Sequence, residues 1–103
     1  MLKINTEFRK GVLFVRLNGT IEDDRYLESI NSLIENIGIR YIVLNTNNLQ
    51  VIDVNNINNI IEYNKRILKD KRRLLICDDN KNRNRVFNNI QKIKCEIDAF
   101  SLI

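Results

Sequence analysis

The sequence predicts an α/β fold: a mixed, mostly parallel sheet of four to five strands, with an antiparallel first strand and packed helices. Short β-rich apolar runs at residues 12–17, 40–44 and 73–77 are nearly continuous, as in strands that are covered on both faces. Segments with helical spacing separate these runs, so right-handed crossovers should join parallel strands. Residues 2–8 alternate apolar and polar and reach the next strand through the turn Arg9-Lys10-Gly11, which makes them the expected antiparallel strand.

The first predicted helix lies between the second and third strands. Its start is acidic at Glu22, Asp23 and Asp24, where the helix dipole favours negative charge, and Gly38 is a good stop. The residues that recur at helical spacing and should face the core are Leu27, Ile30, Leu33, Ile34 and Ile37.

Residues 45–53 are expected to form a loop, followed by a second helix that Asn55 or Asn56 could cap. The inward stripe of this helix is Ile57, Ile60, Ile61, Asn64, Ile67 and Leu68. A shorter helix is expected over residues 82–93, and residues 95–97 are expected to form a last strand. The inward residues of the shorter helix are Val86, Phe87, Ile90 and Ile93.

The 103 residues contain no proline, no low-complexity linker and no internal repeat, which predicts a single domain over residues 1–103. An apolar content of 44% indicates a globular chain. The longest apolar runs, such as residues 41–44, fall far short of the roughly 20 residues that span a bilayer, and the N-terminus lacks a signal-peptide pattern. We therefore expect a cytoplasmic protein with no membrane insertion.

The sequence offers little for catalysis. It has no histidine, no glycine-rich phosphate loop and only two cysteines, Cys77 and Cys95, which are expected to be semi-buried thiols of a reducing compartment. Two thiols without histidine do not make a zinc site, which needs about four ligands. The prediction is a protein without catalytic residues, metal or cofactor.

A basic set surrounds the end of the second helix and continues beyond it. The set consists of Lys65, Arg66, Lys69, Lys71, Arg72, Arg73, Lys81, Arg83 and Arg85. Acidic residues interrupt it and no aromatic platform for stacking bases lies beside it. With a net charge of only +4, a solvated surface is expected rather than a nucleic-acid site.

The segment Val51-Ile52-Asp53-Val54-Asn55-Asn56-Ile57 leads from a buried strand into an amphipathic helix. In an open parallel sheet, loops at the carboxyl ends of strands are where partners bind. A functional interpretation places a binding surface here. The alternative is that Asp53 and Asn55 are only local caps and turn formers.

The whole arrangement resembles the STAS family, whose members include anti-sigma factor antagonists. Residues 11–21 are similar to the family's second strand and glycine turn, and residues 40–46 to its third strand. Val51-Ile52-Asp53 resembles the apolar-apolar-Asp that opens the motif Asp-Ser-Ser/Thr-Gly-Leu. Residues 73–77 and 86–93 fit the next strand and helix. The resemblance covers nearly the whole chain.

The resemblance implies a bacterial transcription regulator that binds an anti-sigma factor, often an ATP-dependent serine kinase. In the family the kinase phosphorylates the second residue after the motif aspartate, and the added charge breaks the complex. Here Asn55 stands at that position and cannot accept phosphate, Val54 replaces the first hydroxyl residue, Asn56 stands at the glycine, and Asn45 stands where aspartate is usual. The predicted partner-binding residues are Asp53, Val54, Asn55, Asn56, Ile57, Asn58 and Asn59.

Three functions follow as hypotheses. The first is a protein-binding module like an anti-sigma factor antagonist, without a phosphorylation switch at Asn55. The second is a degenerate STAS scaffold or subunit of a transport or envelope complex. The third, a small enzyme or nucleotide-binding domain, is disfavoured by the absence of glycine loops and histidine. The sequence makes no prediction of the oligomeric state.

Overall fold

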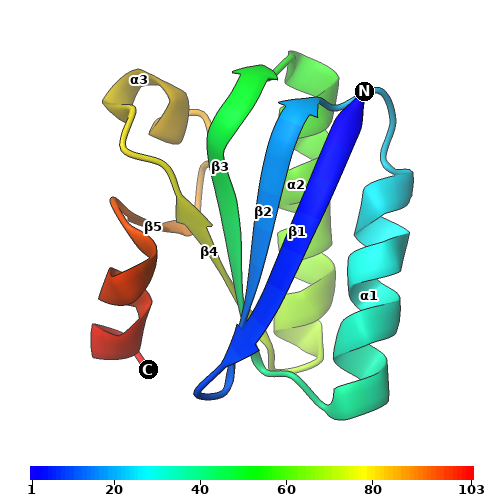
Figure 1. The fold of residues 1–103 in the computed structure, drawn as a ribbon, viewed down its shortest axis with the longest axis vertical. Coiled ribbons are helices and arrows are strands. Elements are labelled where there is room, and N and C mark those ends of the chain that lie inside the picture. Colours follow the sequence, from blue (N-terminus) through cyan, green and yellow to red (C-terminus); the bar gives the residue numbers. More distant parts are fainter.

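The computed structural model describes residues 1–103 and forms a five-stranded sheet with two long helices on one side (Figure 1). Five strands, three helices and a C-terminal 3₁₀ helix follow one another along the chain. Their order is β1 (Leu2–Arg9), β2 (Val12–Thr20), α1 (Arg25–Ile37), β3 (Tyr41–Val51), α2 (Val54–Lys69), β4 (Arg73–Cys77), α3 (Lys81–Asn84), β5 (Gln91–Ile93) and η1 (Glu96–Ser101).

The strands lie in the sheet in the order of the sequence, β1-β2-β3-β4-β5. β1 is antiparallel to β2, with Phe8 opposite Leu13 and Ile4 opposite Leu17. The other three pairs are parallel. This confirms the predicted mixed sheet with an antiparallel first strand. Helical crossovers at α1 and α2 are what allow β2, β3 and β4 to run in the same direction.

The main core lies between the sheet and the two long helices. Alternate residues of β2, namely Leu13, Val15 and Leu17, point to this side and are almost completely buried. Ile30 and Ile34 of α1 and Ile60 and Ile67 of α2 pack against them. The helices bury one stripe each, because a single sheet face covers only one side of a helix.

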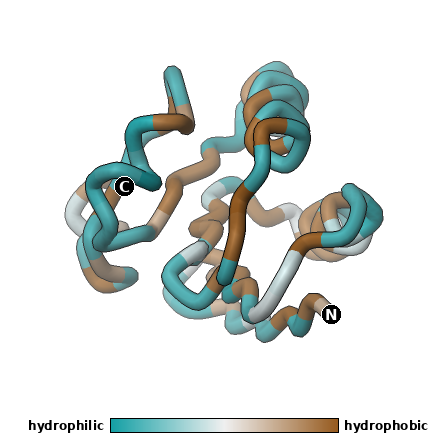
Figure 2. The backbone as a smooth tube through the Cα atoms, turned by 90° about the horizontal axis from the view of Figure 1, so that it is seen from above, coloured by the Kyte–Doolittle hydropathy of each residue, from teal (hydrophilic) through white to brown (hydrophobic).

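A smaller core lies on the opposite face of the sheet, where Val12 and Phe14 of β2 meet Val43, Leu75 and η1. The Phe14 and Phe100 rings pack edge to face with their centroids 5.7 Å apart. Seen from above, the C-terminal segment lies on the other side of the molecule from α1 and α2 (Figure 2). The short η1 therefore closes a face that no long helix covers.

Two local predictions at the C-terminal end were wrong. Residues 82–93 do not form one helix: α3 ends at Asn84, a turn with Asn89 at φ 64° follows, and Ile93 pairs with Cys77 as part of β5. Residues 95–97 are not a strand, because the chain enters η1 at Glu96. Phe87 and Ile90 are buried nonetheless, from a turn rather than from a helix.

The predicted loop at residues 45–53 is mostly strand. β3 continues to Val51 because it pairs with the far end of β2, where Asn18 lies opposite Asn48 and Thr20 opposite Val51. Shifts in register between Arg16 and Asn18 and after Gly19 mark where this extension departs from regular pairing. An asparagine-rich sequence thus becomes strand through its neighbour, against its own propensity.

Several side chains predicted to face the core are exposed, namely Leu33, Ile37, Leu68 and Val86. Tyr26 and Tyr63, which the stripes did not include, are buried. Cys77 is buried as part of the smaller core, whereas Cys95 is exposed in the connection before η1, so the prediction of two semi-buried thiols was wrong for Cys95. None of the helices combines the length and the hydropathy that crossing a bilayer requires.

The two isoleucines near the end of α1 test this packing directly. Ile34 is fully buried and Ile37 is 57% exposed. We expect Ile34→Ala to lower the free energy of unfolding by about 3 kcal/mol, because it leaves a cavity under the sheet. Ile37→Ala, the matched control on the same helix, should cost about 0.5 kcal/mol or less. Urea denaturation followed by circular dichroism measures both; equal losses would contradict the burial described here.

Candidate protein-binding site at the start of α2

The start of α2 is fixed by Asp53. Its backbone is extended (φ −90°, ψ 172°), and its side-chain Oδ1 accepts a hydrogen bond from the Asn56 backbone N–H at 2.9 Å. The helix therefore begins at Val54, and the predicted caps Asn55 and Asn56 are instead in its first turn. Asp53 is thus a local cap, as the alternative interpretation of this segment expects.

The structure divides the predicted binding residues into an outer and an inner group. Asp53, Val54, Asn55 and Asn58 are exposed, and Val54 is 70% exposed. Positions three and four apart share one face of a helix, so Asn58 lies next to Val54 and Asn55 one turn further on. We call these four residues the α2 face. They combine one exposed apolar side chain, two amides and a capping carboxylate.

Asn56 belongs to the inner group. It is 7% exposed, and its Nδ2 donates a hydrogen bond to the Ile21 carbonyl oxygen at 3.4 Å. That bond joins the start of α2 to the connection between β2 and α1. Asn56 has ordinary helical backbone angles, so this position needs no glycine-like conformation.

Ile57 and Asn59 are half-buried at the border of the α2 face. Ile57 packs against the main core. Asn59 lines a shallow cleft of about 110 Å³ between the two long helices. The other lining residues are Asp24, Leu27, Glu28, Glu62, Tyr63 and Arg66. The predicted set is therefore one contiguous segment, but only its outer side chains are free to meet a partner.

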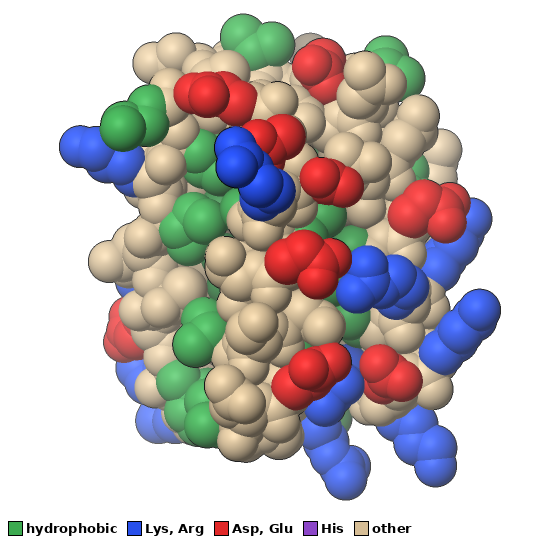
Figure 3. Space-filling view, turned by 90° about the vertical axis from the view of Figure 1, so that its right-hand side faces the viewer, with side chains coloured by type: hydrophobic (Ala, Val, Ile, Leu, Met, Phe, Trp, Pro, Cys, Tyr) green, Lys and Arg blue, Asp and Glu red, His purple; other side chains and the backbone are tan.

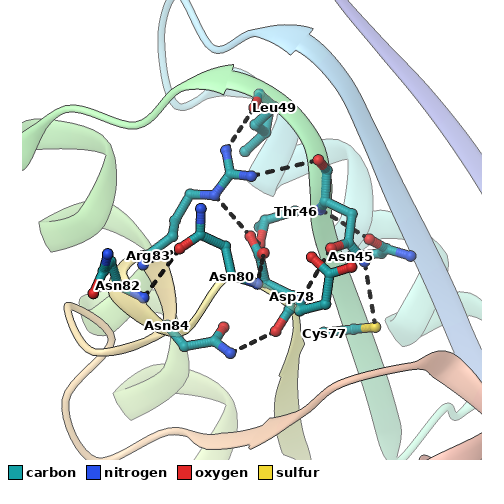
Figure 4. Close-up of polar contacts among 11 residues, drawn as sticks. Asn45, Thr46, Leu49, Cys77, Asp78, Asn80, Asn82, Arg83 and Asn84 are labelled. Atoms are coloured by element: carbon teal, nitrogen blue, oxygen red, sulfur yellow. Dashed lines mark hydrogen bonds and ion pairs between the residues drawn. The ribbon is translucent and has the colours of Figure 1, made fainter.

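An ion pair between the buried Asp78 and the half-buried Arg83 lies at the carboxyl edge of the sheet (Figure 4). Asp78 has no solvent exposure, and its Oδ2 accepts a hydrogen bond from the Thr46 hydroxyl at 2.7 Å. The Asn80 backbone N–H donates to Oδ1 at 2.9 Å, and the Arg83 Nε lies 2.9 Å from Oδ2. Buried carboxylates need such partners, because an isolated charge in a protein interior is strongly unfavourable.

Arg83 also holds the end of β3. Its guanidinium donates to the Leu49 carbonyl at 2.6 Å and to the Asn47 carbonyl at 3.4 Å. The expectation that the whole basic set is a solvated surface was therefore wrong for Arg83, and likewise for Arg72, which donates to the Ile39 carbonyl; both side chains are half-buried. β3 leads to Asp53 and the α2 face, so these hydrogen bonds from Arg83 hold the strand from which the α2 face begins.

Sequence reasoning missed this network of Asp78, Thr46 and Arg83. One indication was available: an Asp-Asp-Asn turn follows a buried strand, with an arginine three residues after the asparagine. The link between Arg83 and the β3 carbonyls depends on tertiary contacts across 34 and 36 residues of sequence. No local pattern specifies it.

A second polar cluster lies on the face that η1 covers. Arg16 donates two hydrogen bonds to the Glu96 carboxylate, at 2.8 and 2.7 Å, and one to Glu7 at 2.8 Å. Asn45 Nδ2 donates to Glu96 at 2.9 Å. Asn45 stands where the STAS family usually has aspartate; an amide can donate to Glu96, whereas a carboxylate would repel it. The hydrogen bonds from Arg16 hold the pKa of Glu96 below its usual range, against the opposing effect of partial burial.

Burial raises the pKa of the Cys77 thiol to about 12, so the thiolate that would act as a nucleophile is scarce at neutral pH. The structure brings together no three histidine, cysteine, aspartate or glutamate side chains in a position to hold a metal ion.

The chain matches no known protein family and no curated protein by sequence. It does match solved structures over its full length. The anti-sigma factor antagonist SpoIIAA in its unphosphorylated form superposes with a TM-score of 0.73 at 15% identity, covering 100% of both chains. An anti-sigma factor antagonist from Mycobacterium paratuberculosis gives a TM-score of 0.77 at 11% identity, covering 100% of this chain and 94% of that one.

An uncharacterized protein with a SpoIIAA-like fold from Shewanella loihica gives a TM-score of 0.61 at 15% identity, covering 98% of this chain and 92% of that one. The chain therefore has the STAS-type α/β fold of SpoIIAA and other anti-sigma factor antagonists. At these identities the similarity establishes the fold.

Replacing Arg83 tests the buried ion pair. Arg83→Met keeps much of the side-chain volume but leaves the Asp78 carboxylate without its cation, and we expect a loss of roughly 3 kcal/mol in the free energy of unfolding. Arg85→Met, at an exposed position two residues later, is the control and should change stability by less than about 0.5 kcal/mol. Chemical denaturation at neutral pH measures both variants. Similar small losses from Arg83→Met and Arg85→Met would show that Arg83 contributes no more to stability than a surface cation does.

The lowered pKa of Glu96 predicts a dependence of stability on pH. A carboxylate whose pKa is lower in the folded state stabilises the fold above its unfolded pKa, about 4.3, and this contribution is lost as the pH falls through the folded value. Wild type should thus exceed Glu96→Gln in unfolding free energy by the largest amount at neutral pH. This difference should become smaller below about pH 4. Asn88→Ala, at an exposed side chain that carries no charge, is the control and should show no comparable change with pH.

Proposed function

We propose that this protein is a regulatory module that binds another protein through the α2 face, in the manner of an anti-sigma factor antagonist. The observation that supports this most is the full-length match to the SpoIIAA fold together with an exposed helix start at the carboxyl edge of the parallel sheet. We further propose that residues 1–103 act as a single domain without catalytic activity, in the cytoplasm of a bacterium, where the bound partner controls transcription.

The chemistry of the α2 face suits a protein partner. Val54 offers an exposed apolar side chain, and the amides of Asn55 and Asn58 beside it can each donate and accept hydrogen bonds. An apolar centre with polar groups around it is the usual composition of a protein–protein contact. The only formal charge, that of Asp53, already accepts a hydrogen bond from the Asn56 N–H.

The proposed partner is an anti-sigma factor, and it can be one of the serine-kinase type. Asn55 has no hydroxyl, so a kinase bound here would find no phosphoacceptor at that position. Thr46 is fully buried and donates to Asp78, and Ser29 and Ser32 lie on α1. The contact is accordingly proposed to be constitutive. The alternative, a scaffold or subunit role in a transport or envelope complex, uses the same face with a different partner.

The identity of the partner is tested by capture with the full chain from native lysate. Recovery of a kinase-like anti-sigma factor supports the proposal, and recovery of transport or envelope subunits supports the alternative.

Placing a charge at residue 55 tests the surface. Asn55→Glu puts a carboxylate on the α2 face and partly imitates a phosphorylated residue. We expect it to weaken binding of the captured partner by about 1–3 kcal/mol, or roughly 5- to 150-fold in Kd, because a polar group is then desolvated without a counterpart. Titration calorimetry of wild type and variant measures this.

The matched control is Asn82→Glu, because Asn82 is likewise exposed and likewise the second residue of its helix, α3. It should leave the affinity within about twofold of wild type. Circular dichroism verifies that both variants fold, which the helix dipole favours for a carboxylate at either position. Equal affinities of wild type and Asn55→Glu for the partner would show that the α2 face is not the interface.

A further inference from the structure

Positive charge is concentrated at the end of the molecule opposite the α2 face. The turns at the amino ends of the parallel strands, residues 8–11, 37–41 and 68–73, together form what we call the base. The base contains seven cationic residues and one acid, Asp70. The seven are Arg9, Lys10, Arg40, Lys69, Lys71, Arg72 and Arg73. The base thus carries +6, more than the +4 of the whole chain, which leaves the rest of the molecule at −2.

The space-filling view shows the same asymmetry. On the side of the molecule shown in Figure 3, basic side chains extend beyond the lower edge. Most of the acidic side chains lie higher on this side. The lower edge in this view is the base, because α1 and α2 both end there (Figure 1). A surface with this distribution orients the whole protein in an external field of negative charge.

Most of these cations have no acidic partner within the protein. Lys10, Arg40, Lys69 and Lys71 form no ion pair, and all four are exposed. Arg72, in contrast, is used internally, since it donates to the Ile39 carbonyl at 2.8 Å and lies 3.6 Å from Asp70. At least four positive charges therefore face solvent without compensation.

The helix dipole does not account for this excess. Cations stabilise the negative C-terminal end of a helix within its last turn. On α2 that explains Arg66 and Lys69, but α1 also ends at the base and has no basic residue in its last turn. Lys10 belongs to the turn between β1 and β2, far from either helix end in sequence.

Exposed apolar side chains lie among these cations. Phe8 is 52% exposed and Ile37 is 57% exposed. A hollow of about 400 Å³, lined by Phe8, Lys10, Arg40 and Tyr41 among others, adjoins a second of about 280 Å³ that contains Lys71 and Arg72. Both hollows share Gly38, Ile39 and Arg40. The base is therefore concave and amphipathic.

We propose that the base is a docking surface for a bilayer that contains anionic phospholipids. Clusters of four to eight Lys and Arg residues bind such surfaces, and each cation near the headgroups raises the affinity by about fivefold. Phe8 and Ile37 add apolar contact at the level where the headgroups meet the acyl chains. Charge complementarity selects the lipid, and the apolar pair favours a bilayer over a purely polar polyanion.

This association is peripheral and requires no insertion of a helix. It goes beyond the proposed function and is compatible with it. The 16 residues of α2 separate the α2 face from the base by about 24 Å along the helix axis. A molecule lying on a membrane by its base would therefore leave the α2 face directed toward the aqueous phase, free to bind its protein partner.

Co-sedimentation of the full chain with vesicles tests the proposal. We expect binding to phosphatidylcholine vesicles with about 30% phosphatidylserine, and little binding to phosphatidylcholine alone. Added salt should weaken the binding, because the Debye length falls to about 3 Å at 1 M ionic strength. Arg40→Glu/Lys69→Glu should lower the partition coefficient roughly tenfold or more, and Ile37→Ser should lower it severalfold.

The matched control is Lys81→Glu/Arg85→Glu, which makes the same change in net charge at exposed cations of α3 and its end. It should change the partition coefficient by less than threefold. Circular dichroism confirms that each variant folds. Equal losses from the two double variants, equal binding to neutral vesicles, or no binding to anionic vesicles would each overturn the proposal. Tighter binding of a single-stranded oligonucleotide of about 20 bases, with the same dependence on Arg40 and Lys69, would assign the base to nucleic acid instead.

Discussion

The carboxylate of Asp78 has no contact with solvent, and the carboxyl edge of the sheet is arranged around it. It accepts hydrogen bonds from Thr46 on β3 and from the turn after β4, and it attracts Arg83 on α3. Removing any one partner would leave a buried charge partly unsatisfied, which is why such groups constrain their neighbours strongly. The ion pair thus fixes how the end of β3 lies relative to the segment after β4.

Through Arg83 this constraint reaches the α2 face. The guanidinium binds the Asn47 and Leu49 carbonyls, so the extension of β3 is held at a point only four residues before the helix cap. Asp53 then starts α2, and Asn56 joins its first turn to the Ile21 carbonyl. Hydrogen bonds at the end of β3, at the helix cap and at Asn56 thus hold the segment that carries the α2 face. A surface held in this way loses little conformational entropy when a partner binds.

The two ends of the molecule differ in charge. The carboxyl edge of the parallel strands bears the α2 face, whose only formal charge is that of Asp53, and the acidic start of α1, whereas the base at the opposite edge holds an excess of six positive charges. The same topology produces both, because every parallel crossover begins at one edge of the sheet and returns at the other. A protein partner at one end and an anionic surface at the other do not compete for space.

The fold was largely accessible from the sequence. Apolar runs at residues 12–17, 40–44 and 73–77, with amphipathic segments between them, predicted three parallel strands joined by helical crossovers, since periodicity determines which residues can be buried together. Gly38 ends α1 as predicted, with φ 64°. The short distance from a buried strand to Asp53 likewise identified the segment that begins α2 and the substitution at Asn55.

Tertiary structure decided what periodicity alone does not specify. β3 extends to Val51 because β2 offers it a partner, and residues 91–93 join the sheet because β4 has a free edge; neither preference is local. Leu33 and Ile37 fit the helical stripe but are exposed, because the sheet covers only a narrow band of α1. Arg83 belonged to a basic set in the sequence and is half-buried against the protein because Asp78, whose position depends on the whole sheet, gives it a counter-charge. Sequence thus determined which elements form, while long-range pairing of strands and charges determined how far each one extends and which side chains it leaves free.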